Sequence, residues 1–286
     1  MNIYHILMKV LGPKTAYRVG RYLYMEARGD IPNHMRNNGE LMVQRCVIKA
    51  VLRSADDKLV CLDVGANVGD WSSALLSGCQ SSQYQSLELY VFEPVPSTAI
   101  VLRKRLGHKE HIHYASLALS SAEGTDVMYV VDETAGTNSL HCEGGDSPAR
   151  AISIDKITAS QFCSLNKIDA IHLLKSDTEG HDMEVIIGAL SLLKEGRIAV
   201  LQFEYNHRWI FSRHYLKDVF DAIKGLPYHV GKICPDHIEV YDHWYPEHER
   251  FFESNYVLLR EDAIAWFNIR DCTLDVNNTL AVASSR

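Results

Sequence analysis

The chain of 286 residues lacks several features that identify particular classes of protein. It has no apolar run near the roughly 18 to 20 residues that cross a bilayer. Lys9 and Lys14 follow a short apolar start without a small-residue cleavage site, which makes a poor signal peptide. The seven cysteines form no Cys-x-x-Cys pair, so neither a zinc knuckle nor a redox dithiol is predicted. We expect a reduced, cytoplasmic protein with no integral membrane segment.

An excess of basic residues is also missing. Lys and Arg number 29 against 36 Asp and Glu, which gives a formal net charge of −7. A nucleic-acid-binding protein usually carries a basic balance or a basic stripe, and the sequence has neither, so we expect no nucleic acid as partner. The composition, 47% apolar and 23% charged, is that of an ordinary globular protein and excludes a disordered chain.

From residue 58 onwards, short apolar runs alternate with segments of helical spacing. This alternation predicts βαβ units, and therefore an α/β fold with a parallel sheet. We expect strands at 58–64, 87–92, 111–119, 168–176 and 198–203, with a final pair at 229–241 and 255–260. We expect helices from about residue 71 and over 97–106, 183–190 and 216–223.

Three regions follow from this pattern. Residues 1–54 read as an N-terminal helical extension, 55–270 as the α/β domain, and 271–286 as a C-terminal tail. Within the domain, residues 120–150 are rich in Gly, Ser and Thr around an apolar run, which predicts a β-hairpin excursion and a loop.

Acidic residues stand at the ends of four predicted strands: Asp63, Glu93, Asp177 and Glu204. In a parallel sheet, ligands bind at the carboxyl ends of the strands. We therefore expect these four carboxylates to share one edge of the sheet and to surround the ligand.

The loop from Asp63 to Asp70 contains Gly65 and Gly69, which permit a tight turn before a helix. It is not a dinucleotide fingerprint, because Asn67 stands where the second glycine belongs, and it lacks the Walker A lysine. Asp63 and Asp70 flank the loop and would repel a diphosphate. A ligand with a cationic group and a ribose, which Glu93 can hold through its hydroxyls, fits better and indicates S-adenosyl-L-methionine.

Four segments together resemble the FkbM family of S-adenosylmethionine-dependent methyltransferases. They are Leu62–Gly69, Phe92-Glu93-Pro94, Leu174–Asp182 and Gln202-Phe203-Glu204. The resemblance implies a Rossmann-like class I methyltransferase sheet of seven strands, the last antiparallel. It also implies O-methyl transfer to a hydroxyl of a natural product or sugar.

The resemblance also implies roles for particular residues. The methionine part of the cofactor would be held by Asp63, Gly65, Asn67 and Gly69. Glu93 would hold the ribose, with Pro94 beside it, and Ser116 and Leu117 would lie near the adenine. Asp177 would face the reacting end.

Methyl transfer to a hydroxyl benefits from a general base, which contributes about 10²- to 10⁴-fold. His181 has the most suitable ordinary pKa, and Asp177, Glu179 and Glu204 are further candidates. The same three acids could instead bind a divalent cation, although clustered acids on a sheet edge do not require one. We therefore predict no metal site.

The acceptor site has no recognised motif. Aromatic and polar residues after the strand ends are candidates for contact with a small-molecule or glycan substrate: Tyr205, His207, Trp209 and Trp244. Two other functions stay open. One is a dinucleotide-dependent oxidoreductase of the NAD type, and the other is a non-catalytic binding module on the same fold. The oligomeric state is not set by the sequence, and a homodimer stays open.

Overall fold

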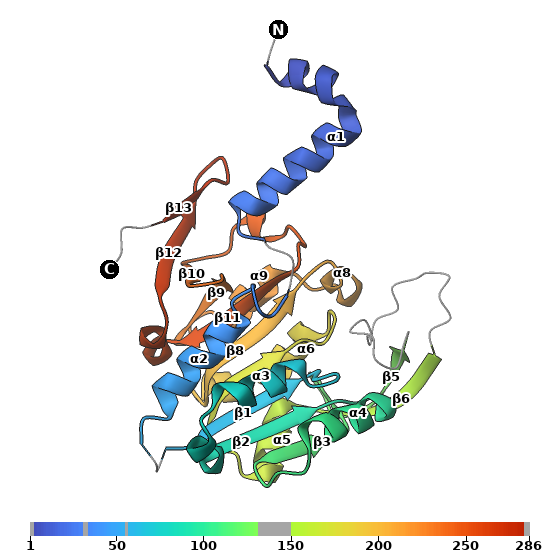
Figure 1. The fold of residues 1–286 in the computed structure, drawn as a ribbon, viewed down its shortest axis with the longest axis vertical. Helices are drawn as coiled ribbons and strands as arrows, with labels where there is room; N and C mark the ends of the chain where they lie inside the picture. Colours follow the sequence, from blue (N-terminus) through green and yellow to red (C-terminus); the bar gives the residue numbers. More distant parts are fainter. Residues whose placement is uncertain (1–2, 31–33, 55–56, 131–149, 283–286) are drawn as a thin grey trace.

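The computed structural model describes residues 3–30, 34–54, 57–130 and 150–282, and its centre is one large twisted sheet (Figure 1). Within these residues the sheet has ten strands in the order β13-β12-β10-β9-β11-β8-β7-β1-β2-β3. Its first five strands in space, counted from one edge, are parallel: β3 (Ile112–Ala115), β2 (Leu87–Phe92), β1 (Leu59–Val64), β7 (Ile171–Ser176) and β8 (Ile198–Tyr205).

The expected seven-stranded arrangement is confirmed by the next two strands. β11 (Ser254–Arg260) lies between β8 and β9 (Tyr228–Ile233) and is antiparallel to both. Three further strands extend the sheet: β10 (Ile238–Tyr241), β12 (Ile269–Leu274) and β13 (Leu280–Val282). Residues 271–286, expected to be a tail, therefore begin inside a strand of the central sheet.

Helices cover both faces of the sheet, which explains why its central strands are continuous apolar runs. On one face, side chains of β1 and β2 form a core with α2 (Glu40–Val51), α3 (Asp70–Gly78) and α4 (Pro96–Leu106). The opposite core includes α5 (Ala159–Asn166), α6 (Asp182–Gly188), α7 (Leu190–Lys194), α8 (Trp209–Ser212) and α9 (Leu216–Ala222). Short 3₁₀ helices lie at η1 (Ser81–Ser86), η2 (Pro246–His248) and η3 (Glu261–Trp266).

The N-terminal helix α1 (Ile3–Ala27) projects from the body of the molecule (Figure 1). It bends at Gly12, which has φ +70° and precedes Pro13. Just after the helix, the buried carboxylate of Asp30 accepts hydrogen bonds from Lys232 of β9 and from Arg250, and within the helix Tyr24 packs edge-on against Phe252. No helix in the described part of the chain combines the length and the apolar character that a membrane span requires.

Two predicted strands are each divided in the structure. The strand expected at 111–119 becomes β3 and β4 (Ala118–Leu119), because the chain leaves β2 after Ala115 and joins a second, three-stranded sheet. That sheet has the order β4-β6-β5, with β5 (Gly124–Val130) antiparallel to β6 (Arg150–Ile157) as the expected hairpin requires. The rest of the excursion, 131–149, lies outside the described residues. The strand expected at 229–241 turns at Cys234–His237 and becomes β9 and β10.

Candidate active site

The loop after β1 has backbone geometry that glycine adopts easily. Gly65 has φ +74° and Gly69 has φ +86°. The N–H groups of Gly65 and Ala66 donate to the carbonyl oxygen of Phe92, at 3.1 and 2.9 Å. A Cβ atom on Gly65 would lie 2.0 Å from the carbonyl oxygen of Asp177. The loop is therefore packed directly against the end of β7, and it joins the carboxyl ends of β1, β2 and β7.

Asp63 lies beneath this loop and is fully buried. Its Oδ2 accepts a hydrogen bond from Ser72 Oγ at 2.6 Å, and its Oδ1 lies 3.5 Å from Lys175 Nζ. Lys175 Nζ is also 3.2 Å from Asp177 Oδ2. Burial opposes the charge of Lys175, but the carboxylates of Asp177 and Asp63 outweigh it and raise the pKa of Lys175. Asp63 thus connects strand ends through Lys175 and does not line the cavity described below.

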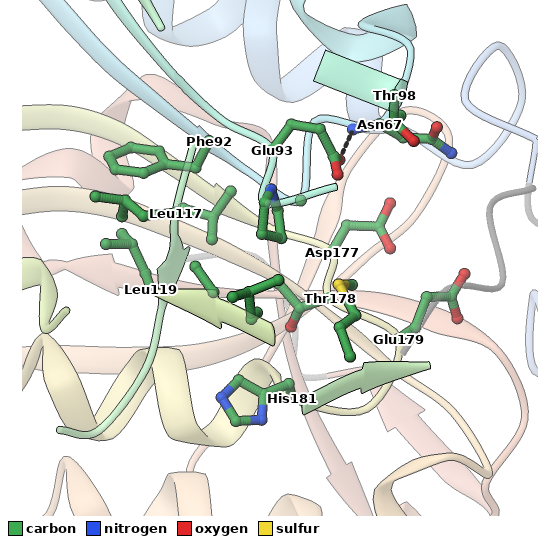
Figure 2. A pocket seen from close by; sticks show the side chains of 16 residues that line it. Asn67, Phe92, Glu93, Thr98, Leu117, Leu119, Asp177, Thr178, Glu179 and His181 are labelled. Atoms are coloured by element: carbon green, nitrogen blue, oxygen red, sulfur yellow. Dashed lines mark hydrogen bonds between the residues drawn. The ribbon is translucent and has the colours of Figure 1, made fainter. Parts of the chain in front are cut away.

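Glu93 ends β2 with its carboxylate directed at the loop. Its Oε2 accepts from the backbone N–H of Asn67 at 2.9 Å, shown as the dashed line in Figure 2, and its Oε1 accepts from that of Val95 at 2.8 Å. Burial raises the pKa of Glu93 to about 7, although the two hydrogen bonds oppose the shift. Each oxygen keeps a second lone pair, so the carboxylate can still accept from hydroxyl groups of a ligand.

A cavity opens at this edge of the sheet, as the sequence predicts. In Figure 2 the apolar side chains of Phe92, Leu117 and Leu119 lie on one side, and the carboxylates of Asp177 and Glu179 lie on the other. The described residues that line it include no lysine or arginine. The lining residues in the described part of the chain are Val64, Gly65, Asn67, Phe92, Glu93, Pro94, Thr98, Leu117, Ala118, Leu119, Met128, Ile154, Asp177, Thr178, Glu179 and His181.

Two expected cofactor contacts lie outside this lining. Gly69 begins α3, and a Cβ atom there would meet Leu102 of α4 at 2.6 Å, so its role is to pack the helix. Ser116 is exposed, and its hydroxyl accepts a hydrogen bond from Arg103 at 3.1 Å. Asp70, expected to repel a diphosphate, forms an exposed ion pair with Arg105 at 2.5 Å and is also absent from the lining. Among the described residues, the acidic groups of the cavity are therefore Glu93, Asp177 and Glu179.

The four candidates for general base divide into two groups. His181, Asp177 and Glu179 line the cavity, whereas Glu204 does not. His181 begins α6, is almost fully buried, and has Nε2 at 3.0 Å from Ser120 Oγ. Asp177 has the more exposed side chain, 40% accessible, and is paired with Lys175.

Glu179 and Glu204 form an acidic cluster with Asp177, in which one carboxylate oxygen from each lies within 4.8 Å of the others. Burial and the charge of Asp177 raise the pKa of Glu179 to about 8, and they raise that of Glu204 well above its ordinary value. Arg208 Nη1 lies 2.5 Å from Glu179 Oε2. Arg208 and Lys175 supply positive charge to two of the three acids, and the raised pKa values of Glu179 and Glu204 indicate that the negative charge of the cluster is only partly compensated.

The predicted acceptor contacts are dispersed. Tyr205 and Trp209 are buried in the core, where the Tyr205 hydroxyl donates to Glu249 and the Trp209 indole donates to the Glu204 carbonyl at 2.9 Å. Trp244 donates to Glu249 at 2.8 Å, and His207 is exposed. None of the four lines the cavity, so burial argues against Tyr205 and Trp209 as direct acceptor contacts.

Sequence reasoning missed Lys175 and the apolar contribution of the second sheet. Lys175 is a charge inside the apolar strand Ile171–Ser176, and such a residue needs a buried partner, which is a readable signal. Met128 of β5 and Ile154 of β6 complete the apolar wall, and nothing in their local sequence indicates that the hairpin folds over the cavity.

Comparison with known proteins agrees with this geometry. The family model of the Methyltransferase FkbM domain matches residues 63–230, more than half of the chain. The chain belongs to this family of methyltransferases.

Individual relatives are distant. The chain is similar to the hexuronic acid methyltransferase AglP of Haloferax volcanii, with 24% identity over 169 residues, 57% of this chain and 63% of that protein. It thus spans less than two thirds of that relative's length. Among solved structures it is similar to the methyltransferase FkbM from Methylobacillus flagellatus, with a TM-score of 0.44, 14% identity, and coverage of 70% of this chain and 43% of that one. It is also similar to a putative rRNA-methylase from Clostridium thermocellum, with a TM-score of 0.40, 10% identity, and coverage of 78% and 97%.

Proposed function

We propose that this methyltransferase uses S-adenosyl-L-methionine and methylates a hydroxyl group of a sugar or another small molecule. The observation that carries the proposal is the cavity at the ends of β1, β2 and β7, with the buried Glu93 carboxylate in its wall and no basic side chain among its described lining residues. A dinucleotide has a diphosphate that needs positive charge or free N–H groups, and this cavity offers carboxylates instead. The NAD-dependent oxidoreductase is therefore disfavoured.

The lining residues fit the chemical groups of the proposed cofactor. Asn67 lines the cavity, and its buried Oδ1 atom has no hydrogen-bond partner among the described residues. An amino group can donate to this oxygen, and the hydroxyls of a ribose can donate to Glu93. Phe92, Leu117 and Leu119 offer an apolar surface for a purine ring.

When bound, S-adenosyl-L-methionine supplies a methyl group on a positively charged sulfur. The residues at the open end of the cavity then orient the acceptor and take its proton. His181 and Asp177 are our candidates for this role, because both line the same cavity as Glu93. Correct orientation supplies up to roughly 7–11 kcal/mol of the barrier, and a base about 3–5 kcal/mol.

A sugar as acceptor is supported by the similarity to AglP, which is named as a hexuronic acid methyltransferase. A panel of sugars, uronic acids and macrolide-type alcohols, offered with radiolabelled methyl donor, tests the acceptor class. Methylation of an RNA or of an amine in place of every alcohol would contradict the proposal. Cofactor binding with no turnover on any acceptor would favour the non-catalytic module.

Binding of S-adenosyl-L-methionine is expected to weaken by roughly tenfold between about pH 8 and about pH 6. The pKa of Glu93 is about 7, so the carboxylate is ionised at the higher pH and protonated at the lower, where its own proton competes with the ribose hydroxyls. Calorimetry at both pH values measures the change, with NAD as the competing ligand.

The matched variants for this experiment are Glu93→Gln and Glu88→Gln. Glu93→Gln is expected to bind weakly and to lose the part of the pH dependence that Glu93 causes, leaving only that of Glu179, which also lines the cavity and has a pKa of about 8. Glu88 lies on the same strand outside the cavity and pairs with His113, so Glu88→Gln should keep the wild-type pH profile. A Glu93→Gln variant with the same slope as wild type would remove Glu93 from the cofactor site.

Substitution His181→Ala is expected to lower kcat by about 10²- to 10⁴-fold with cofactor affinity kept, because it removes a candidate base and leaves the Glu93 subsite intact. Single-turnover assays, run with and without a chelator, separate chemistry from binding and from any metal requirement. The control is His108→Ala, an exposed residue after α4 that does not line the cavity. If His181→Ala is as active as this control, the base is Asp177 or an acid beside it.

A further inference from the structure

A second cluster of potential ligands lies away from the cavity, at the turn between β9 and β10. Cys234, His237 and Glu239 are all buried, with 4%, 7% and 7% of their surface exposed. The Cys234 sulfur, a His237 ring nitrogen and a Glu239 carboxylate oxygen lie within 4.8 Å of one another. None of the three lines the cavity, so this cluster is independent of the methyl-transfer site.

The histidine of this cluster is held in a defined orientation. His237 Nδ1 lies 2.7 Å from Asp236 Oδ1, so the Nδ1–H group donates to that carboxylate. The opposite nitrogen, Nε2, is buried and has no hydrogen-bond partner among the described residues. It lies 4.0 Å from Glu239 Oε1, which is too long for a hydrogen bond. A carboxylate behind a histidine whose other nitrogen faces a cluster of donors is the usual arrangement of a metal-binding histidine.

The glutamate is oriented in a similar way. The hydroxyl of Tyr241 donates to Glu239 Oε2 at 2.6 Å, which leaves Oε1 directed toward His237. The thiol of Cys234 completes the group. Burial raises its pKa to about 12, so it is a neutral thiol until a cation displaces its proton.

We propose that Cys234, His237 and Glu239 bind a divalent zinc ion. A thiolate, an imidazole and a carboxylate are all donors that zinc accepts, and donors within 4.8 Å of one another must draw together to roughly 3.5 Å to make tetrahedral bonds of about 2.0 to 2.3 Å to a central ion. Three protein ligands leave the fourth tetrahedral position to water.

The position of the cluster indicates a structural role for the ion. All three ligands lie within six residues of one hairpin, and the carbonyl oxygen of Cys234 would lie only 2.2 Å from a Cβ atom on Gly39, just before α2. The ion would therefore fix the β9–β10 turn against the segment that leads into α2. Lys232 of β9, which binds Asp30 just after α1, is two residues before Cys234 in the chain.

Cobalt(II) is the probe that tests this site, because thiolate ligation to cobalt gives a charge-transfer band in the near ultraviolet. We expect tag-free, full-length protein to show this band on titration, to saturate it at one ion per chain, and to lose it on addition of zinc. Metal analysis of the protein as purified should find zinc at the same ratio. Absence of the band, or saturation at no defined ratio, would overturn the proposal.

Variants assign the ligands. Cys234→Ser is expected to abolish the band, and His237→Gln is expected to weaken cobalt binding by at least about 10-fold. Cys79→Ser removes another buried thiol, from the end of α3, and should leave the band unchanged. Glu179→Gln should also leave the band unchanged, which would exclude the cluster of Asp177, Glu179 and Glu204 as the source of the band. If Cys234→Ser does not fold, Glu239→Gln replaces it, with lower cobalt affinity expected. A band that persists in Cys234→Ser, or wild-type affinity in Glu239→Gln, would contradict the assignment.

Discussion

Replacing Gly65 by alanine is expected to weaken binding of S-adenosyl-L-methionine by at least about 100-fold, because a displacement near 1 Å in a binding site has effects of this size. The new Cβ atom would lie 2.0 Å from the carbonyl oxygen of Asp177, which is backbone and cannot rotate away. The loop must therefore separate from the end of β7. Asn67, two residues further on, would leave its hydrogen bond to Glu93.

The backbone angle of Gly65 also contributes, and a matched glycine separates the two causes. Gly107 has φ +75°, almost the same as the +74° of Gly65, but a Cβ atom there meets nothing within 4 Å. Gly107→Ala therefore carries the conformational strain, of order 1–3 kcal/mol, without the collision. Calorimetry should show near wild-type cofactor affinity in Gly107→Ala. Equal affinities in the two variants would mean that the loop does not form the cofactor site.

The sequence predicts the turn at Gly65, but it does not predict that this turn packs against Asp177. Gly65 and Gly69 indicate a sharp loop after a buried strand, since glycine is the residue that readily takes a positive φ. Asp177 is more than a hundred residues away, and its carbonyl reaches Gly65 only because β7 pairs with β1. The order of the strands in the sheet brings the two residues together, and the apolar pattern of each strand does not predict that order.

The five parallel strands were predictable for a physical reason. β1, β2, β7 and β8 are covered on both faces, so nearly every side chain must be apolar, and a polar residue marks the end of the strand. Glu93 and Asp177 were therefore found at the correct edge. β12 and β13 extend the far side of the sheet outside the predicted strands, and β13 has only three residues, which is too short for a clear alternation.

The expected acceptor residues show where residue type alone misleads. Tyr205 and Trp209 follow Glu204, and their aromatic faces suit a ligand as well as they suit a core. In the structure β8 continues through Tyr205, and α8 returns Trp209 against Phe203 and Tyr205. The choice between the two environments depends on the path of the chain after the strand, and the local sequence does not fix that path.

The second large effect is expected at Lys175. Substitution Lys175→Met should lower the free energy of unfolding by about 3–5 kcal/mol at neutral pH, the cost of leaving a buried charge without its partner. Lys175 is buried and, among the described residues, is the only lysine or arginine that forms an ion pair with Asp63, at 3.5 Å. Chemical denaturation followed by circular dichroism measures the loss. Lys217→Met removes an exposed ion pair with Asp221, so it should cost less than about 1 kcal/mol.

The loss in Lys175→Met is expected to shrink as the pH falls toward about 4, because burial already raises the pKa of Asp63 above its unfolded value near 3.9. A carboxyl whose folded pKa is raised destabilises the fold above its unfolded pKa, where the folded protein must hold the unwanted charge. Protonation at low pH removes that charge from the variant. The double variant Lys175→Met, Asp63→Asn should recover part of the loss at neutral pH. If the free energy of unfolding falls by the same amount at both pH values and in the double variant, Lys175 stabilises the fold by packing. Its charge would then not be what holds β1 and β7 together beneath the cavity.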